Sequence, residues 1–406
     1  MAKPKLSILI TTPFHAPELT GVGRYSGELA RGLAQRGNSV EVVAPPPYYP
    51  GWHVRAPYSA KRYQTEKLEG TTVRRCPIFI RPNASGLVRL LSPVSFAITS
   101  APVVFWRVVT GRPDVVLVVE PTLASVPVAW AAARLVGART VLHVQDLELD
   151  AALVVGHMKL PKLAEKAAFA FERLLMRGFD RIVTISNKMA DAIGRKRVPA
   201  DRIALIRNWV DVDSIKPLAS ANPYRAELGI ADDRFVCLYS GQIGRKQALH
   251  LMLEAAERLA ADSRFVFVVA GEGPEKEPLQ ARYGGLSNVR FLGLQPEERL
   301  NAFLNLADCH ILPQDAGVSD LVLPSKLGGM LASGRRILVT ADDDSELAMF
   351  LEGTASIVPP GDPDAIAREL KLLIDAPDEK SEQRLDLARS ISSQICLDRF
   401  DELLGR

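Results

Sequence analysis

The sequence predicts two doubly wound α/β domains, each a mostly parallel sheet covered by helices on both faces, with a cleft between the domains. Three observations lead to this prediction. The chain has 406 residues, which is too long for one ordinary hydrophobic core. Short β-branched runs alternate with stretches of helical periodicity, as is typical of parallel strands joined by crossover helices. The alternation stops at residues 208–221 and then restarts, which indicates two such halves.

The first half contains the apolar runs of six expected strands. After the first run, Val22, Tyr25, Leu29 and Leu33 fall on one helical face. Gly37 ends that helix. The strands are expected at 6–10, 40–44, 115–119, 140–144, 181–185 and 203–206. We therefore assign residues 1–207 to a first domain.

The second half repeats the alternation. Residues 208–221 are polar and contain a proline, so they are expected to be an interdomain linker. A second domain then covers 222–385, with helices over 248–260 and after Pro324, and a C-terminal helix over 386–406 that can cross back to the first domain. Its strands are expected at 235–240, 265–270, 289–292, 310–313, 336–340 and 356–358.

Composition places the chain among globular proteins. Hydrophobic residues make up 47% and charged residues 24%. The net charge of +3 is small and evenly spread, which disfavours a nucleic-acid partner but permits an anionic small molecule. The four cysteines lack metal-binding spacing and are expected to be inert thiols. We recognise no signal peptide and no uninterrupted apolar span of about 20 residues, so we expect a cytoplasmic protein.

The segment "TTPFHAPELTGVGR" follows the first strand and carries Glu18 and Gly21-Val22-Gly23. Glycine permits close backbone approach and a helix N-terminus attracts anions, so these residues can receive a diphosphate. A tight strand-to-helix turn explains them equally well. No third glycine follows at the spacing of a G-x-G-x-x-G motif, which disfavours a nicotinamide cofactor.

The segment "YSGQIGRKQ" opens the second domain. Gly241 and Gly244 bound a turn, and Arg245 and Lys246 stand just before an amphipathic helix. The helix dipole does not favour cations at a helix start. We therefore prefer an anionic ligand at this turn, the alternative being a solvated basic turn.

The segment "DLVLPSKLGG" combines a helix start with a further cation. Pro324 can begin a helix, with Ser325 and Lys326 in its first turn. Asp320 lies nearby. A site for phosphate and hydroxyl groups and plain surface decoration are equally consistent with this pattern.

The segment "VLHVQDLELD" ends a predicted buried strand in polar residues. His143, Gln145 and Asp146 lie at the carboxyl end of a parallel strand, where active sites of α/β sheets are found. A core histidine is the simpler interpretation of His143 taken alone. Asp146 is more easily explained by function.

The segment "PPPYYPGW" follows the second strand. Tyr48, Tyr49 and Trp52 can pack on a sugar ring or a lipid headgroup. A well-packed loop is an equally good interpretation.

Seven segments in one order carry a resemblance to a known family. Together they resemble the nucleotide-sugar glycosyltransferases of family 4, with two Rossmann-like domains in the GT-B architecture. They are most similar to the WcaI-type group of colanic acid synthesis, over nearly the whole chain. The segments are "PELTGVGRY", "APPPYYPGW", "RTVLHVQDLELDA", "NWVD", "YSGQIGRKQ", "DCHI" and "VLPSKL".

The resemblance implies a retaining enzyme that needs no metal and no other cofactor. It also implies that the first domain binds a polyprenyl-diphosphate-linked sugar acceptor and the second a GDP- or UDP-sugar donor. The WcaI-type group is associated with fucosyl transfer in exopolysaccharide synthesis. A GDP-fucose-like donor is therefore the leading expectation.

Site residues follow from matching these motifs position by position. Diphosphate contacts are expected from Gly21, Val22, Gly23, Arg245, Lys246, Ser325 and Lys326. Ribose or sugar contacts are expected from Asp320, Gln247 and Gly271, and catalytic contacts from His143, Gln145 and Asp146. Glu18, Tyr48, Tyr49 and Trp52 are expected on the acceptor side.

The sequence departs from the family at four positions. Gln242 and Gln247 replace an arginine and a lysine, Gly329 replaces a glutamate, and Gln145 replaces a histidine. We expect Lys246 to take over the diphosphate contact. The WcaI-type group is expected to share these departures, which then mark a subgroup.

The resemblance also suggests a mechanism. Retention commonly uses a pair of carboxylates, and no such pair is evident. We therefore expect front-side attack, in which the departing phosphate takes the acceptor proton and the protein supplies positioning and electrostatics.

Residues 86–112 combine apolar side chains with arginines, as in an interfacial membrane segment. Residues 157–177 carry a similar mixture but are more simply interpreted as a core helix. Two rival functions remain at this stage, a sugar-nucleotide epimerase of the same fold and a non-catalytic scaffold of a polysaccharide assembly complex.

Overall fold

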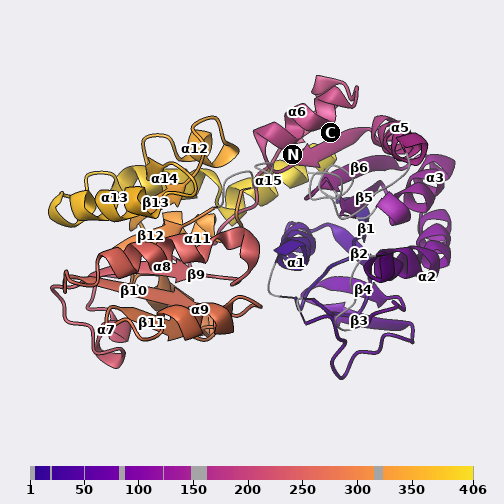
Figure 1. Ribbon diagram of the computed structural model, residues 1–406. Helices are drawn as coiled ribbons and strands as arrows, with labels where there is room; N and C mark the ends of the chain where they lie inside the picture. The colour runs from indigo at the N-terminus through magenta and orange to yellow at the C-terminus, as the bar shows by residue number, and fades with distance from the viewer. Residues whose placement is uncertain are drawn as a thin grey trace. The chain divides into compact units, whose positions relative to one another are not determined.

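The chain forms two compact units, each a mostly or fully parallel sheet with helices packed on it (Figure 1). The first unit comprises Met1–Arg207 and Cys396–Arg406, and the second comprises Asn208–Ile395. The computed structural model describes residues 5–18, 21–49, 51–81, 87–121, 123–147, 162–314 and 323–405. The predicted fold class is confirmed.

The first unit contains an eight-stranded sheet. Its strands are β1 (Ser7–Thr11), β2 (Ser39–Ala44), β3 (Gln64–Leu68), β4 (Thr71–Arg75), β5 (Val115–Glu120), β6 (Arg139–Val144), β7 (Arg181–Thr184) and β8 (Ile203–Leu205). They lie in the order β3-β4-β2-β1-β5-β6-β7-β8. In the centre, Ile8 of β1 pairs with Val40 on one side and Val115 on the other. The six predicted strands are thus confirmed.

Strands β3 and β4 form an antiparallel hairpin that the sequence analysis missed. The hairpin turns at Glu69 and Gly70, whose φ angles are 47° and 82°. Two positive φ angles are the signature of the tight turn that matches the twist of a hairpin. Strand β3 is polar and half exposed, so it has no apolar alternation from which to predict it.

Helices connect the strands of the first unit. They are α1 (Gly21–Gln35), α2 (Leu87–Gly111), α3 (Val126–Val136), α5 (Lys162–Gly178) and α6 (Asn187–Arg195). The predicted face of α1 is confirmed at Tyr25, Leu29 and Leu33, which are buried, whereas Val22 is only partly buried. Gly37 follows the helix with φ +90°.

Helix α2 runs without a break through Pro93 and Pro102. The sequence analysis expected no uninterrupted apolar span of about 20 residues, and this helix corrects that expectation. Its residues Leu91–Gly111 are long and apolar enough to cross a membrane, although length and composition alone also fit a helix packed on a soluble domain. Phe96 and Val108 on one face are buried, so α2 packs along one side.

The chain returns to the first unit at its end. The expected single helix over 386–406 is two helices, α14 (Ser381–Ser390) and α15 (Ser393–Gly405). From Cys396 onward α15 packs on the first unit: Asp398 pairs with Arg36 at 2.6 Å, and Asp401 accepts a hydrogen bond from Asn38 at 2.8 Å. The predicted return of the C-terminal helix is confirmed.

The second unit contains a six-stranded parallel sheet in the order β11-β10-β9-β12-β13-β14. All six predicted strands are confirmed. They are β9 (Phe235–Ser240), β10 (Phe265–Ala270), β11 (Val289–Leu292), β12 (Cys309–Leu312), β13 (Arg336–Thr340) and β14 (Ser356–Val358). Its helices include α7 (Pro223–Glu227), α8 (Leu249–Arg258), α9 (Lys276–Tyr283), α10 (Leu300–Leu304), α11 (Leu327–Ala332), α12 (Glu346–Leu351) and α13 (Pro363–Asp375).

Two expectations about the second unit need correction. Residues 208–221 do not stand free as a linker, because Val210 and Ile215 are buried in the core of this unit. Helix α11 begins at Leu327, so Pro324 precedes the helix instead of starting it.

Candidate functional site

Two glycine-containing loops meet at the carboxyl end of the second sheet. The loop after β9 bonds to the loop after β10, with Ile243 N donating to Glu272 O at 2.9 Å. Gly271 has φ +141°, and a Cβ on it would lie 1.8 Å from the carbonyl oxygen of Gly241. Only glycine allows this contact. Gly271, predicted to contact the donor, therefore also has a structural role in joining the two loops.

Lys326 points back to these loops. Its Nζ donates to the Tyr239 hydroxyl at 2.6 Å, and that hydroxyl donates to the Gln242 carbonyl oxygen at 2.6 Å. The amine also lies 3.8 Å from the centre of the Tyr239 ring. A Cβ on Gly241 would lie 2.8 Å from this amine. The φ angle of +142° at Gly241 favours glycine, and the lysine amine lies in the space that a side chain would enter.

Burial lowers the pKa of Lys326 to about 7. Within the part of the chain that the structure describes, no acidic side chain forms an ion pair with it. An amine in this condition gains from the arrival of an anion, because the anion restores the charge that burial disfavours. Lys326 therefore has the properties of an anion-binding residue.

Arg245 and Lys246 lie in the 3-10 turn η3 (Arg245–Gln247), just before α8, as predicted. Both side chains are exposed, and no ion pair is present for either among the described residues. Gln247 N donates to Gly244 O at 3.2 Å and closes the turn. Two exposed cations therefore follow the loop that Lys326 contacts.

Ser325 is exposed and precedes α11, so its predicted place in the first helical turn was wrong. Asp320 lies outside the described residues. The helix itself packs firmly, with Leu327 and Met330 buried. The backbone of α11 is thus a fixed support for Lys326.

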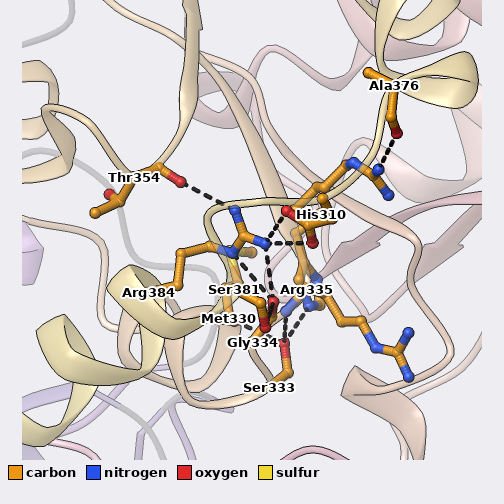
Figure 2. Close-up of polar contacts among 11 residues, drawn as sticks. His310, Met330, Ser333, Gly334, Arg335, Thr354, Ala376, Ser381 and Arg384 are labelled. Carbon is orange, nitrogen blue, oxygen red and sulfur yellow. Dashed lines mark hydrogen bonds and ion pairs between the residues drawn. The ribbon is translucent and has the colours of Figure 1, made fainter.

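A buried arginine holds the far end of α11 (Figure 2). Arg384 donates to Gly334 O through Nε at 3.1 Å and Nη2 at 3.0 Å, and to Thr354 O at 3.2 Å. It also pairs with Asp378. Ser333 bonds to His310 Nε2 at 3.1 Å. The sequence analysis missed this network because Arg384 lies in a polar tail with no motif around it.

In the first unit, Glu18 joins two loops at the carboxyl end of the sheet. Its Oε1 accepts hydrogen bonds from the backbone amides of Tyr48 and Tyr49, both at 2.9 Å. Its Oε2 is buried and has no hydrogen-bond partner among the described residues. Burial raises the pKa of Glu18 to about 7, although the two amides and Arg75 oppose this. The carboxyl group orients the aromatic loop.

The glycines after the first strand lie in the first turn of α1, not in a loop. Gly21 has φ +58°, a conformation that favours glycine. A Cβ on Gly23 would lie 2.4 Å from Glu18 Oε2. Val22, between the two glycines in the sequence, is partly buried. Glu18 itself therefore explains why a glycine stands at position 23.

The aromatic loop is packed against the segment that follows the first strand. Tyr48 is buried, with its ring 5.4 Å from Phe14 and 5.6 Å from Trp52. Tyr49 and Trp52 remain partly exposed. Tyr48 therefore fits the packed-loop interpretation. The rings of Tyr49 and Trp52 keep part of their surface accessible to a ligand.

Arg75 is a second organiser of these loops that the sequence analysis missed. It is buried and donates to Pro45 O at 3.0 Å and Ala16 O at 2.5 Å. Its Nε bonds to Glu66 at 2.7 Å. Arg75 thus ties the loops on which Glu18 acts to strand β4, and its only sequence signal is the unusual position of an arginine at a strand end.

The predicted polar cluster begins in β6 with His143 and continues just after the strand with Gln145 and Asp146. His143 Nε2 lies 3.0 Å from Gln145 Nε2, and the His143 ring packs edge-on against Phe400 of α15 at 5.0 Å. Burial lowers the pKa of His143 to about 3, so the ring stays neutral at physiological pH. Asp146 is partly exposed. On the neighbouring strand, Glu120 is the last residue of β5 and is fully buried. The sequence analysis did not select this carboxylate.

No cluster of three or more His, Cys, Asp or Glu side chains that could hold a metal occurs in the described ranges. All four cysteines are free and buried.

Comparison with known proteins identifies the class. The family described as "Glycosyl transferase 4-like domain" matches residues 20–209, and "Glycosyl transferases group 1" matches residues 220–390. Anabaena HepE in complex with UDP and glucose has the same fold, with a TM-score of 0.69 at 14% identity over 98% of this chain and 99% of that one. WaaG, a glycosyltransferase involved in lipopolysaccharide biosynthesis, gives 0.68 at 14% identity, with 98% and 99% covered. The fold is that of a GT-B glycosyltransferase.

A relative from Escherichia coli K12, "Putative colanic acid biosynthesis glycosyl transferase WcaI", is 37% identical over 408 residues. The match covers 97% of this chain and 98% of that protein. The chain belongs to glycosyltransferase family 4, whose members are retaining and metal-independent.

Proposed function

We propose that this enzyme transfers a sugar from a nucleotide diphosphate sugar to a lipid-linked sugar acceptor during exopolysaccharide synthesis. The observation that carries the proposal is Lys326, a partly buried amine held beside the glycine loops with no acidic ion-pair partner among the described residues. The name of the WcaI relative supports a role in a colanic-acid-like polymer. Nucleotide-sugar binding is supported by the HepE structures with UDP and with UDP-glucose.

The donor diphosphate is assigned to the second unit. We expect Lys326 to contact it from the start of α11, and Arg245 and Lys246 to contact it from the exposed turn. The Ser325 hydroxyl would donate a further hydrogen bond. Charge that develops on the departing diphosphate is stabilised best by groups that are already in place. The Lys326–Tyr239 hydrogen bond and the packing of α11 supply that preorganisation.

The acceptor is assigned to the first unit, on the side of Glu18, Tyr49 and Trp52. Asp146 is the proposed polar contact to the transferred sugar. His143 is not a suitable proton carrier, since its pKa near 3 keeps it neutral. In front-side attack the departing phosphate takes the acceptor proton, so no protein base is needed at that step.

The donor sugar is proposed to be fucose or a related deoxysugar carried on GDP. A screen of GDP- and UDP-sugars with a polyprenyl-diphosphate-linked glucose acceptor, read by mass spectrometry, tests this. An acceptor that gains the mass of a deoxyhexose supports the proposal. A gain of the mass of a hexose would contradict the proposed donor sugar but not the proposed transfer. Conversion of the nucleotide sugar without transfer indicates an epimerase, and absence of any donor binding indicates a scaffold.

Access to a lipid-linked acceptor leads us to propose peripheral attachment to the inner face of the cytoplasmic membrane through α2. Ile98, Phe105 and Trp106 are exposed on this helix, and Leu135 is exposed on the neighbouring α3. The structure also leaves Leu174 of α5 exposed, so α5 is less buried than the core helix expected over 157–177, of which 157–161 lie outside the described residues.

Co-sedimentation with vesicles of phosphatidylcholine containing phosphatidylglycerol tests the attachment. Ile98→Ser combined with Trp106→Ser is expected to remove most binding at low salt. Leu294→Ser, an exposed leucine in the second unit, is the control. Equal binding by wild type and the double variant would remove α2 from the proposal.

A further inference from the structure

A cavity of about 550 Å³ opens at the amino-terminal ends of the strands in the first unit. It lies between the starts of β5, β6 and β7 and the last turn of α15. Because the strands are parallel, this is the edge opposite to the one that carries Glu18 and Asp146. The cavity is therefore separate from the candidate active site.

Arginine dominates the charge in this cavity. Arg134, Arg139, Arg181 and Arg202 line it together with Asp180, which leaves a surplus of three positive charges. We call it the arginine pocket. An adjoining cavity of about 340 Å³ shares Arg181 and Arg202 with it and adds Arg399 together with the carboxylates of Asp201 and Glu402, so it does not extend the surplus of positive charge beyond the arginine pocket.

The structure gives these guanidinium groups few internal partners. Arg139 bonds to the Leu404 carbonyl oxygen, Arg181 to the Asp201 carbonyl oxygen at 2.9 Å and Arg202 to the Arg177 carbonyl oxygen at 3.4 Å. Such contacts with neutral carbonyls orient a guanidinium but leave its charge uncompensated.

The single carboxylate in the arginine pocket does not neutralise it. Asp180 Oδ2 already accepts from the Thr140 amide at 2.8 Å and the Thr140 hydroxyl at 2.9 Å. Its Oδ1 lies 3.5 Å from Arg134, a long contact between largely exposed side chains. Exposed pairs of this kind contribute little.

We propose that the arginine pocket binds a phosphate group, at a site distinct from the donor site. Each guanidinium presents several N–H donors in a planar fork that matches phosphate oxygens. The cavity has room for a phosphate or a diphosphate with attached groups. Because Arg139 donates to the Leu404 carbonyl oxygen of α15 and Leu403 of that helix also lines the pocket, the ligand would also hold the C-terminal helix against the rest of the first unit.

The phosphate can belong to a soluble molecule or to a lipid headgroup. Leu135, next to Arg134 at the end of α3, is 70% exposed and gives a lipid an apolar neighbour. The shared chemistry is the phosphate, and the two sources are separated by experiment.

Hydrogen–deuterium exchange of the full chain, analysed over peptides from 134–141, 177–182 and 396–405, locates the ligand. One arm uses inorganic phosphate and pyrophosphate, and the other uses vesicles of phosphatidylcholine with or without phosphatidylglycerol. We expect slower exchange in these peptides with at least one probe. The variant that combines Arg181→Gln with Arg202→Gln should bind the protecting probe with an apparent affinity at least tenfold lower than that of wild type.

The control is Arg31→Gln with Arg195→Gln, which removes the same charge elsewhere in the first unit. It should stay within twofold of wild type. Protection by the soluble anions identifies a free phosphate ligand, and protection only by phosphatidylglycerol vesicles identifies a headgroup. Absence of protection with every probe, or equal protection in the Arg181/Arg202 variant, would overturn the proposal. Using peptide-level protection separates this cavity from anion binding at Lys326 and Lys246.

Discussion

Both sheets are built mainly of parallel strands, but the loops at the carboxyl ends of their strands carry side chains of different charge. In the second unit, Arg245, Lys246 and Lys326 cluster around glycine loops, without acidic ion-pair partners among the described residues. In the first unit, Glu18 and His143 are buried, and their contacts are to backbone amides, Gln145 and an aromatic ring. The glycine loops of the second unit thus carry cationic side chains, and the loops of the first unit carry oriented neutral and acidic groups.

This difference indicates how one fold serves two substrates. Parallel α/β sheets place ligands at the carboxyl ends of their strands whatever the ligand is. The side chains there then determine which ligand each edge accepts. A diphosphate suits the cationic edge, and the hydroxyls of a sugar acceptor suit the other.

Replacing Lys326 by methionine tests the cationic edge most directly and should have the largest effect. Methionine keeps the volume of the side chain, and Tyr239 keeps its bond to Gln242 O. We expect kcat/KM for donor to fall about 100- to 1000-fold, as for loss of one preorganised charge-stabilising donor. Steady-state kinetics on the folded variant measures this.

Lys371→Met removes an exposed lysine of the same unit and should change kcat/KM less than twofold. If Lys326→Met also retained wild-type kcat/KM, the diphosphate assignment of this edge would be wrong.

Gly271→Ala should separate the structural role of the glycine loops from their binding role. The new Cβ meets the Gly241 carbonyl oxygen at 1.8 Å in a backbone conformation with φ +141°. We expect a loss of about 3 kcal/mol or more in the free energy of unfolding, measured by urea denaturation of the full chain. Gly285→Ala, where a Cβ meets nothing within 4 Å, should change it by less than about 1 kcal/mol. Equal stability of the two variants would contradict the close packing of the loops.

Glu18→Gln tests the acidic edge through the pH dependence of stability. The pKa of Glu18 is raised from 4.5 to about 7 in the folded state, so between these values the folded chain binds more protons than the unfolded chain. Its contribution to stability is therefore lost as pH rises from about 4.5 through about 7. Glutamine should match wild type near pH 5 and exceed it by about 1–2 kcal/mol near pH 8.

Chemical denaturation at the two pH values checks this expectation, with Glu28→Gln as the control, since Glu28 is paired with Arg24 on the surface. If the difference in free energy of unfolding between wild type and Glu18→Gln were the same at pH 8 as at pH 5, the pKa of Glu18 would not be raised by folding.

The strands were predictable because apolar periodicity reports burial. Residues 115–120, for example, are fully buried and uniformly apolar up to Glu120. The hairpin β3–β4 was not predictable in this way, because its strands are polar and its tight turn is marked only by Glu69-Gly70. Residues 208–221 misled for a related reason: their polar composition concealed Val210 and Ile215, which pack into the second unit.

Sequence motifs located candidate site residues but not their partners. Lys326 could be selected from its motif, whereas its bond to Tyr239 depends on how β9 and α11 come together. Gly23 could be read as a phosphate contact, and only the structure shows that the Glu18 carboxyl group occupies the space beside it. Arg384 had no signal at all, since a buried arginine among carbonyls is a property of the tertiary fold.

The last prediction uses the low pKa of Lys326 to sharpen the contrast between the edges. The free amine titrates near pH 7, and a bound diphosphate raises its pKa, so donor binding should take up a proton above pH 7. Donor affinity should therefore fall about fivefold from pH 7 to pH 8, because the charged fraction falls by that factor. Isothermal titration in buffers of different ionisation enthalpy measures both the affinity and the proton. Lys326→Arg keeps its charge across this range and should bind with an affinity independent of pH, whereas an equal decline in both proteins would place the titrating group elsewhere.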